Sequence, residues 1–306
     1  MKRKSLVPPR ILTTLVALLL LGLLPLAVPP APLAQPGDPL LLGIEPEHNI
    51  FDQMERYRAL AAYLSDQLGV KVNLTIMSRY GEVIKRIRDR QLDGAFLSAY
   101  TATMGIHQLG LVPVVSPVNL NGKSTAKGYI FVRGDSGIRS VTDMRGKSMM
   151  YVDPATMEGY LYPRAYLRGQ GIADLETFFS RYSFAGSHAS VVFAVLDGRA
   201  DIGAAKDTVF EKLKLQDASI GKELRILDQS PEEPEVTLCL RKEMAADLRE
   251  KIGAALLHME KTSRGKKVLK QFEALRFIAS APSDFVTIEQ MAQEAGMSLQ
   301  APDAGQ

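Results

Sequence analysis

Two tyrosines follow predicted strands at positions where ligands are often bound. Tyr80 follows the strand over residues 70–77, and Tyr100 follows the strand over residues 92–97. The carboxyl ends of parallel strands form the usual ligand-binding edge of an open α/β sheet. The sequence therefore offers both rings as candidates to line a ligand cleft, with ordinary packing at the sheet edge as the alternative.

His188 and Asp207 occupy comparable positions in the second half of the chain. His188 lies at the start of a predicted helix, an end that offers hydrogen-bond donors to an anion, so its side chain either contacts a ligand or bonds locally. Asp207 follows the predicted strand over residues 201–205 and either contacts a ligand donor or caps the next helix. Glu45 and Glu47, after the first strand, are further candidates for the same edge.

The residue patterns of common enzyme mechanisms are missing from the sequence. It contains no Gly-x-Ser-x-Gly turn, no His-Glu-x-x-His pair and no Gly-x-x-x-x-Gly-Lys-[Ser/Thr] loop. The single cysteine, Cys239, lies in an apolar predicted strand without an activating base, and the four histidines are scattered. We therefore expect a protein that binds a ligand and is not an enzyme, with no cofactor and no metal site.

Strand and helix patterns alternate along the chain after residue 38. Apolar alternation predicts strands at 39–44, 70–77, 92–97, 111–118 and 128–133, and helical spacing predicts helices at 52–68, 80–90 and 101–109. The pattern then repeats, with strands at 148–152, 201–205, 225–228 and 236–241 and helices at 140–144, 160–169, 190–197, 207–214, 244–261 and 265–272. This rhythm favours parallel sheets covered by helices on both faces.

The N-terminus is typical of an export signal. Basic residues within positions 2–10 precede an apolar run over 11–24, which is shorter than the roughly 20 residues that span a bilayer. Prolines and small residues follow, so we expect cleavage near Ala34. The alternative is an uncleaved anchor, which would be the protein's single attachment to the membrane. Either way, we expect a periplasmic protein.

The distribution of charge argues against a nucleic-acid partner. The 306 residues include 37 Lys plus Arg and 34 Asp plus Glu, a formal net charge of +3. Residues 1–34 hold four of the basic side chains and no acidic one, which leaves 33 basic and 34 acidic residues in the rest of the chain. A nucleic-acid-binding domain would carry a basic face of its own. We therefore predict no nucleic-acid partner.

Three segments of the chain, taken in order, resemble one protein family. They are Tyr80 to Ile84 leading to Leu92 to Tyr100, Asp153 to Gly159 opening a helix, and Ala185 to His188 followed by Val195 to Ala204. Their order and spacing resemble the phosphonate-binding-protein-like periplasmic solute-binding proteins, over roughly residues 40–260. The resemblance implies an α/β, two-lobed periplasmic binding protein of type II (the Venus-flytrap fold). In that fold each lobe is a sheet covered by helices, and the ligand cleft lies between the lobes.

The repeated pattern and the Pro-rich link over residues 230–235 predict where the lobes begin and end. We expect residues 1–34 to be a signal peptide or anchor, residues 40–125 plus 235–300 to form lobe 1, residues 126–228 to form lobe 2, and residues 301–306 to be a disordered tail.

The resemblance also points to the turn after Asp153. In related proteins that bind phosphonates, a turn of hydroxyl residues at a helix N-terminus holds the anion through backbone N–H groups. In this chain one hydroxyl remains, at Thr156, followed by Met157 and Glu158. A carboxylate ~4 Å from a bound dianion costs several kcal/mol, so Glu158 either points to solvent or contacts a cationic or hydrogen-bond-donating part of a ligand. The ligand-binding residues we predict are Tyr80, Tyr100, Thr156, Met157, Glu158, His188 and Asp207.

A receptor of this family implies a partner in the membrane. We expect an exported solute-binding receptor that captures a small, oxyanion-bearing ligand for an ABC-type importer, with the ABC permease as partner. The alternative is a periplasmic sensory receptor of the same fold that reports ligand occupancy to a membrane sensor kinase.

Overall fold

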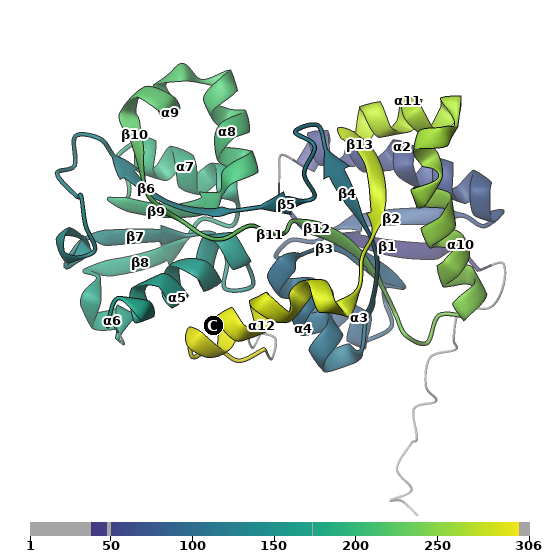
Figure 1. Ribbon diagram of the computed structural model, residues 1–306, viewed down its shortest axis with the longest axis horizontal. Coiled ribbons are helices and arrows are strands. Elements are labelled where there is room, and N and C mark those ends of the chain that lie inside the picture. Colours follow the sequence, from purple (N-terminus) through teal and green to yellow (C-terminus); the bar gives the residue numbers. More distant parts are fainter. Residues whose placement is uncertain (1–37, 48–49, 173, 300–306) are drawn as a thin grey trace, which may run out of the picture. The chain divides into compact units, whose positions relative to one another are not determined.

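The computed structural model describes residues 38–47, 50–172 and 174–299 of the chain. The predicted export signal and the predicted tail lie outside these residues. Figure 1 shows helices packed around two main sheets, with a two-stranded ribbon between them along the chain. Among the described helices, none combines the length and the hydrophobicity that a membrane span requires.

The first sheet has six strands in the order β13-β4-β12-β3-β1-β2. These strands are β1 (Leu40–Ile44), β2 (Val72–Ile76), β3 (Gly94–Ser98), β4 (Val112–Asn119), β12 (Val236–Leu240) and β13 (Ala274–Ala279). β1 pairs in parallel with β2 and β3, whereas β12 runs antiparallel to β3 and β4, and β13 antiparallel to β4. The helices that accompany this sheet are α2 (Ile50–Leu68), α3 (Glu82–Arg88), α4 (Ala99–Leu109), α10 (Ala246–Leu257) and α11 (Ser263–Phe272).

Strand β3 shows how this sheet is held between two layers of helices. All five of its residues are buried. Phe96 belongs to a core shared with α2, where its ring lies 5.0 Å from that of Tyr57. Its neighbours Ala95 and Leu97 point to the other face and pack in a core with Val83 of α3. Both faces of the strand are apolar because helices cover both sides.

The second sheet has five strands in the order β10-β6-β9-β7-β8. These are β6 (Gly128–Arg133), β7 (Ser148–Tyr151), β8 (Arg181–Phe184), β9 (Ile202–Lys206) and β10 (Leu224–Gln229). β7 pairs in parallel with β8 and β9, whereas β6 runs antiparallel to β9 and β10. Its helices are α5 (Tyr162–Gly169), α6 (Leu175–Phe178), α7 (His188–Leu196), α8 (Asp207–Gln216) and α9 (Ala218–Glu223).

Both sheets are mixed, so the prediction of parallel sheets is only partly right. The reversed strands are β6 and β12, the first main-sheet strand after each passage of the chain from one sheet to the other, together with β13 at the edge of the first sheet. Between them, β5 (Thr125–Ala126) and β11 (Glu233–Pro234) pair as a short antiparallel ribbon. Hydrophobic periodicity reveals that a segment is a strand but not the direction in which it pairs, and this limit explains the error.

Several element boundaries differ from the sequence-based expectation. The helix expected from Tyr80 begins at Glu82, and the helix expected over 244–261 ends at Leu257, followed by a short 3₁₀ turn. The helix expected over 160–169 begins as α5 at Tyr162, with Pro163 in its first turn. β13 and α12 (Val286–Glu294) were not predicted from the sequence.

The last described helix contacts elements of both sheets. α12 packs against α4 and against α5. Its Ile288 and Ala292 belong to the same hydrophobic core as Phe131 of β6. Thr287 also donates a 2.6 Å hydrogen bond from Oγ1 to Glu233 in the ribbon. The C-terminal helix therefore links the two halves of the described chain.

Candidate functional site

A buried lysine lies where the two sheets meet, at the end of β9. Lys206 is the last residue of that strand and is fully buried. Its ammonium Nζ donates a hydrogen bond to Oε1 of Glu47, which follows β1 of the other sheet. Nζ also lies 3.7 Å from Oε1 of Glu158 and 4.0 Å from Oε1 of Glu235. Three carboxylates thus share one cation, and we call these four residues the Lys206 cluster.

The backbone of β9 fixes the origin of the lysine side chain. The Lys206 N–H donates to Nδ1 of His188 at 3.0 Å, and Lys206 pairs with Gly128 in the β6–β9 ladder. All five residues of β9 are buried, so the ammonium cannot reach solvent. A buried charge is tolerated only when it is paired. The three carboxylates provide that pairing.

Burial and mutual charge set the protonation of the cluster. Burial lowers the pKa of Lys206, but Glu158, Glu47 and Glu235 outweigh it and raise that pKa above its usual value. Burial raises the pKa of Glu158 to about 7, although the neighbouring ammonium opposes the shift. Burial likewise raises the pKa of Glu235. Glu158 can therefore gain or lose a proton near neutral pH, whereas the lysine stays charged.

A tight turn before α5 brings Glu158 into the cluster. Glu158 lies in a short π-helix, Met157–Leu161, which leads directly into α5. Gly159 is required there, because a Cβ at that position would lie 2.4 Å from Cγ2 of Val152. Gly128 of β6 allows a second close approach, since its Cβ would lie 3.2 Å from the Glu158 Cα.

The interpretation that Glu158 points to solvent is wrong, because its side chain is fully buried. The turn is typical of an exposed helix start when it is considered alone. The sequence of the turn does not reveal that β6 and β9 pack against it. The carboxylate therefore faces Lys206 instead of water.

Some polar atoms near the cluster have no hydrogen-bond partner among the described residues. They include both carboxylate oxygens of Glu158, Oε1 of Glu45 and the hydroxyl of Tyr80, all of them buried. The Tyr80 ring packs edge-on against His188, with ring centroids 6.2 Å apart. Buried polar groups in native proteins are nearly always hydrogen-bonded. These atoms are therefore ready to bind a ligand or ordered water.

Three of the seven predicted ligand-binding residues, Tyr80, Glu158 and His188, thus lie together around Lys206. The side chains of the other two residues in the Asp153 turn are used elsewhere. Thr156 donates from Oγ1 to the carbonyl oxygen of its own turn residue Asp153, at 2.7 Å. Met157 is buried in the hydrophobic core of the second sheet.

The last two predicted residues make structural contacts away from the ammonium. The Tyr100 hydroxyl donates to the carbonyl oxygen of Ser298, at 2.9 Å, and so anchors the C-terminal segment. Oδ1 of Asp207 accepts hydrogen bonds from the N–H groups of Lys127 and Thr208, at 2.9 and 2.7 Å. These bonds hold the start of α8, the local role that the sequence left open for Asp207.

Sequence reasoning missed Lys206 and Glu235, although it named Glu47 as a candidate. A usable signal for Lys206 was its place at the end of a strand whose other residues are apolar or small. Glu235 belongs to a segment rich in proline and glutamate, which is typical of an exposed linker. Its contacts depend on Thr208 Oγ1, which donates to it at 2.9 Å, and on Asn119 Nδ2, both distant in sequence.

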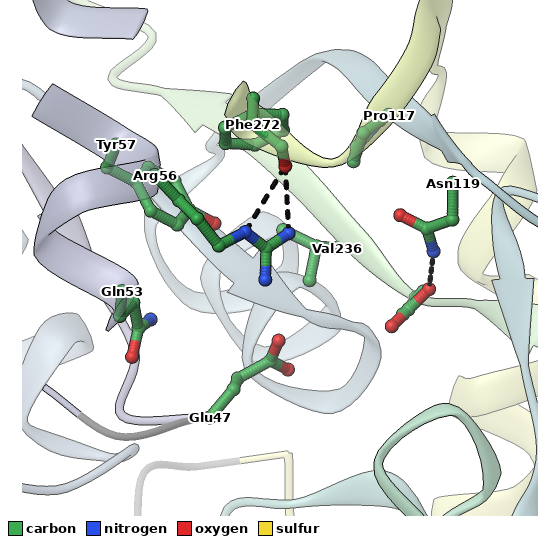
Figure 2. A pocket seen from close by; sticks show the side chains of 9 residues that line it. Glu47, Gln53, Arg56, Tyr57, Pro117, Asn119, Val236 and Phe272 are labelled. Atoms are coloured by element: carbon green, nitrogen blue, oxygen red, sulfur yellow. Dashed lines mark hydrogen bonds between the residues drawn. The ribbon is translucent and has the colours of Figure 1, made fainter. Parts of the chain in front are cut away.

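A small pocket adjoins the cluster on the side of the first sheet. It encloses about 30 Å³, room for one or two water molecules. Glu47 and Glu235 line it together with Gln53, Arg56, Tyr57, Pro117, Asn119, Val236 and Phe272. Figure 2 shows the carboxylate of Glu47 and the guanidinium of Arg56 pointing into the same space, with Arg56 bonded to the carbonyl oxygen of Phe272. The pocket extends the cluster but is too small for more than a fragment of a ligand.

Comparison with known families matches most of the chain to one of them. Residues 42–285 match the model of the periplasmic substrate-binding proteins of phosphonate ABC transporters. The chain belongs to this family. The members of the family are substrate-binding proteins of transport systems rather than enzymes.

Two curated relatives have related descriptions. The phosphate-import protein PhnD of Mycolicibacterium smegmatis is 29% identical over 182 residues, which is 56% of this chain and 56% of that protein. The chain therefore spans little more than half the length of that relative. The phosphonates-binding periplasmic protein of Escherichia coli is 24% identical over 233 residues, covering 75% of this chain and 68% of that protein.

Solved structures of this family share the fold. A binding protein of an ABC phosphonate transporter from Pseudomonas aeruginosa superposes with a TM-score of 0.76 at 20% identity, covering 85% of this chain and 87% of that one. PhnD1 from Prochlorococcus marinus, in complex with methylphosphonate, gives a TM-score of 0.75 at 19% identity, covering 86% and 100%. The predicted fold, a two-lobed α/β periplasmic binding protein, is confirmed.

Proposed function

We propose that this protein is an exported receptor that captures a small, oxyanion-bearing solute between two lobes and delivers it to an ABC importer. The match of residues 42–285 to the substrate-binding family of phosphonate transporters carries the proposal. The buried ammonium of Lys206 supports it, because the Lys206 cluster joins residues of the two sheets where such a ligand would be enclosed. The periplasm is the compartment that fits this role.

The lobes of the proposed receptor correspond to residues 40–125 plus 235–300 and residues 126–228. The chain passes between them through the β5–β11 ribbon, so closure would be a hinge motion of the kind known for periplasmic binding proteins. Opening would separate Lys206 from Glu47, which lie on different sheets, and would leave Lys206 beside Glu158.

We infer that the protein binds its ligand without chemical conversion. Burial raises the pKa of the Cys239 thiol, which keeps it from acting as a nucleophile. The described residues contain no group of three or more His, Cys, Asp or Glu side chains arranged to hold a metal ion. The family favours an ABC permease as partner over a sensor kinase.

A thermal-shift screen tests this function directly. The purified protein is heated with phosphate, phosphite, alkylphosphonates, sulfonates, amino acids or polyamines. A true ligand at about 100 times its dissociation constant stabilises the folded protein by ~2.7 kcal/mol, a shift that is readily measured. Stabilisation by at least one oxyanion is expected. Stabilisation by none of them, or by the amines alone, would overturn the proposal.

A further inference from the structure

The last described helix, α12, is fixed to the first lobe of the proposed receptor at both of its ends. Directly before the helix, Phe285 is buried in the core that α3 and β3 share. After the helix, the carbonyl oxygen of Ser298 accepts a 2.9 Å hydrogen bond from the Tyr100 hydroxyl, and that of Leu299 accepts one from the Gln108 side chain. Tyr100 and Gln108 belong to α4. The path of α12 is therefore set by the helices of the first sheet.

Between these two ends, the apolar face of α12 packs into the second lobe. Ile288 and Ala292, together with Ala295 directly after the helix, are fully buried and belong to the same core as Phe131 of β6. The helix contacts α5 and the π-helix Met157–Leu161, and Figure 1 shows it running between α4 and α5. A helix that the first lobe holds at both ends thus fills part of the core of the second lobe.

Separation of the two lobes would break this contact. Because its ends are held by the first lobe, α12 cannot follow the second lobe, and its apolar face would be pulled away from α5 and the π-helix. Water would then reach Ile288, Ala292 and Ala295, and exposure of apolar surface costs free energy in proportion to its area. The packing of α12 therefore favours the closed arrangement without any contribution from a ligand.

We propose that α12 is a clasp, whose apolar face holds the ligand-free receptor closed, and that a ligand enters only when this face is released from the second lobe. The inference rests on the proposed function, but it concerns the resting conformation of the receptor and not the chemistry of its ligand. In the closed arrangement the pocket beside Glu47 and Glu235 encloses only about 30 Å³, so a whole ligand cannot enter it without opening.

The clasp also lies next to the ligand site. The π-helix that α12 contacts carries Glu158, whose carboxylate lies 3.7 Å from the ammonium of Lys206. Lys206 in turn donates to Glu47 of the first lobe. Release of α12 would therefore free the same turn that brings Glu158 into the Lys206 cluster.

A polar substitution on the apolar face distinguishes a clasp from a permanent part of the core. A charged side chain is costly in a buried contact but not in water. If α12 can leave the second lobe, such a variant escapes the cost by opening and stays folded. If α12 never leaves it, the variant pays the cost in the folded state and unfolds. Far-UV circular dichroism and thermal unfolding show which of the two occurs.

The distance between the lobes is measured on the full chain without ligand. The single native cysteine, Cys239, is fully buried, so cysteines introduced by Lys85→Cys on α3 and Gln170→Cys at the end of α5, both at exposed positions, can be spin-labelled selectively. Double electron–electron resonance should give one distance population in this background. Adding Ala292→Asp should shift the population to longer distances. Adding Gln293→Asp, the same charge at the exposed neighbouring position, should leave it unchanged.

A milder pair of variants keeps the clasp testable if Ala292→Asp does not fold. Ile288→Ala removes part of the apolar contact without adding a charge, so it should shift a smaller fraction of the molecules to longer distances. Val286→Ala removes a similar amount of side chain from the same helix at an exposed position and should have no effect.

The rate of ligand entry provides the functional measurement. Stopped-flow mixing with methylphosphonate should show association about tenfold faster in Ala292→Asp than in the wild type, because the open fraction that admits the ligand is larger. Gln293→Asp should associate at the wild-type rate. An open Ala292→Asp variant that associates no faster than the wild type would overturn the claim that release of the clasp limits ligand entry.

The distance measurement separates this inference from the proposed function. Long distances in the ligand-free wild type, or a folded Ala292→Asp with the wild-type distance, would overturn the clasp. Loss of the fold in both Ala292→Asp and Ile288→Ala would also overturn it, because α12 would then be a permanent part of the core. A receptor that opens as described but binds no oxyanion would overturn the proposed ligand class and leave the clasp in place.

Discussion

Two buried glutamates, one at the edge of each sheet, show different ways of keeping a carboxyl group out of water. Glu45 follows β1, and its Oε2 accepts a 2.7 Å hydrogen bond from the N–H of Ser98 at the end of β3. Glu158 lies beside β9 and has the Lys206 ammonium at 3.7 Å but no hydrogen-bond donor among the described residues. Burial raises the pKa of Glu45 to about 8 and that of Glu158 to about 7.

The difference separates a structural carboxyl from one available for binding. Glu45 is held by the backbone of its own sheet, so its contact with Ser98 does not depend on Lys206. Glu158 relies on a single cation that it shares with Glu47 and Glu235. Oε1 of Glu45 has no hydrogen-bond partner among the described residues, so Glu45 is satisfied at one oxygen and Glu158 at neither. The less satisfied carboxyl group, Glu158, is therefore the stronger candidate for ligand contact.

The largest expected effect comes from removing the shared cation. Lys206→Met leaves three buried carboxylates without their counter-charge and should destabilise the protein by about 3–5 kcal/mol at pH 8. The loss should shrink as the pH falls, because Glu158 and Glu235 then take up protons. Urea unfolding at several pH values measures it.

The exposed pair of Lys123 and Glu232 provides the control for that measurement. Lys123→Met should change stability little, since a solvent-exposed ion pair contributes little. Equal losses in the two lysine variants would show that the buried cluster has no special role.

A second prediction separates the two glutamates by pH. The folded-state pKa values of both carboxyl groups lie above the ordinary 4.5, so protonation of each group favours the folded state. This contribution to stability is complete below about pH 4.5. It is lost as the pH rises through 7 for Glu158 and through 8 for Glu45. Glu158→Gln and Glu45→Gln should therefore each reduce the pH dependence of stability, by roughly 1–3 kcal/mol between pH 5 and 9. Unfolding titrations of both variants measure it.

Ligand affinity should distinguish these same two variants. Glu158→Gln should change the preference among oxyanions, whereas Glu45→Gln should leave every affinity within twofold of the wild type. A change in ligand preference in Glu45→Gln would mean that both glutamates belong to the site.

A third prediction concerns the carboxylate that competes with the ligand. Glu47 now accepts the hydrogen bond that a ligand oxygen would receive from Lys206. Glu47→Gln weakens that internal contact and should tighten oxyanion binding by about threefold to tenfold, part of the ~1.5–3 kcal/mol of a charge-assisted hydrogen bond. Calorimetry with methylphosphonate measures it, and weaker binding would show that Glu47 contacts the ligand itself.

The smallest expected effect is at Tyr100. Its hydroxyl bonds the carbonyl of Ser298, so Tyr100→Phe should cost ~1 kcal/mol of stability and leave ligand affinity unchanged. Thermal unfolding and calorimetry on the same preparation check both halves of the prediction. A clear loss of affinity would return Tyr100 to the ligand-binding residues that the sequence predicts.

Most elements of the fold could be predicted from periodicity, whereas their pairing could not. Strand β3 and helix α2 have strong apolar patterns and were predicted close to their observed bounds. The antiparallel placement of β12 beside β3 depends on where the chain returns after the second sheet, a long-range property that no local pattern contains. β13 was missed because three of its six residues, including Leu275 and Arg276, are exposed and disturb the alternation.

Residues of the site could be predicted from the sequence only where they follow a predicted strand or begin a predicted helix. Tyr80 and His188 follow strands or open helices, and the structure brings them together. Lys206 escaped notice because lysine is normally exposed, and its partner Glu47 lies 159 positions away in sequence. The sequence alone does not show which charged side chains pair in a buried cluster; the three-dimensional positions of all of them are needed.

The most direct test of ligand binding at the Lys206 cluster is a crystal structure of the protein with methylphosphonate bound. We expect a phosphonate oxygen within hydrogen-bond distance of Lys206 Nζ, a second one within reach of Glu158, and the carboxylate of Glu47 displaced from the lysine. A ligand bound elsewhere, with the hydrogen bond between Lys206 and Glu47 intact, would contradict it.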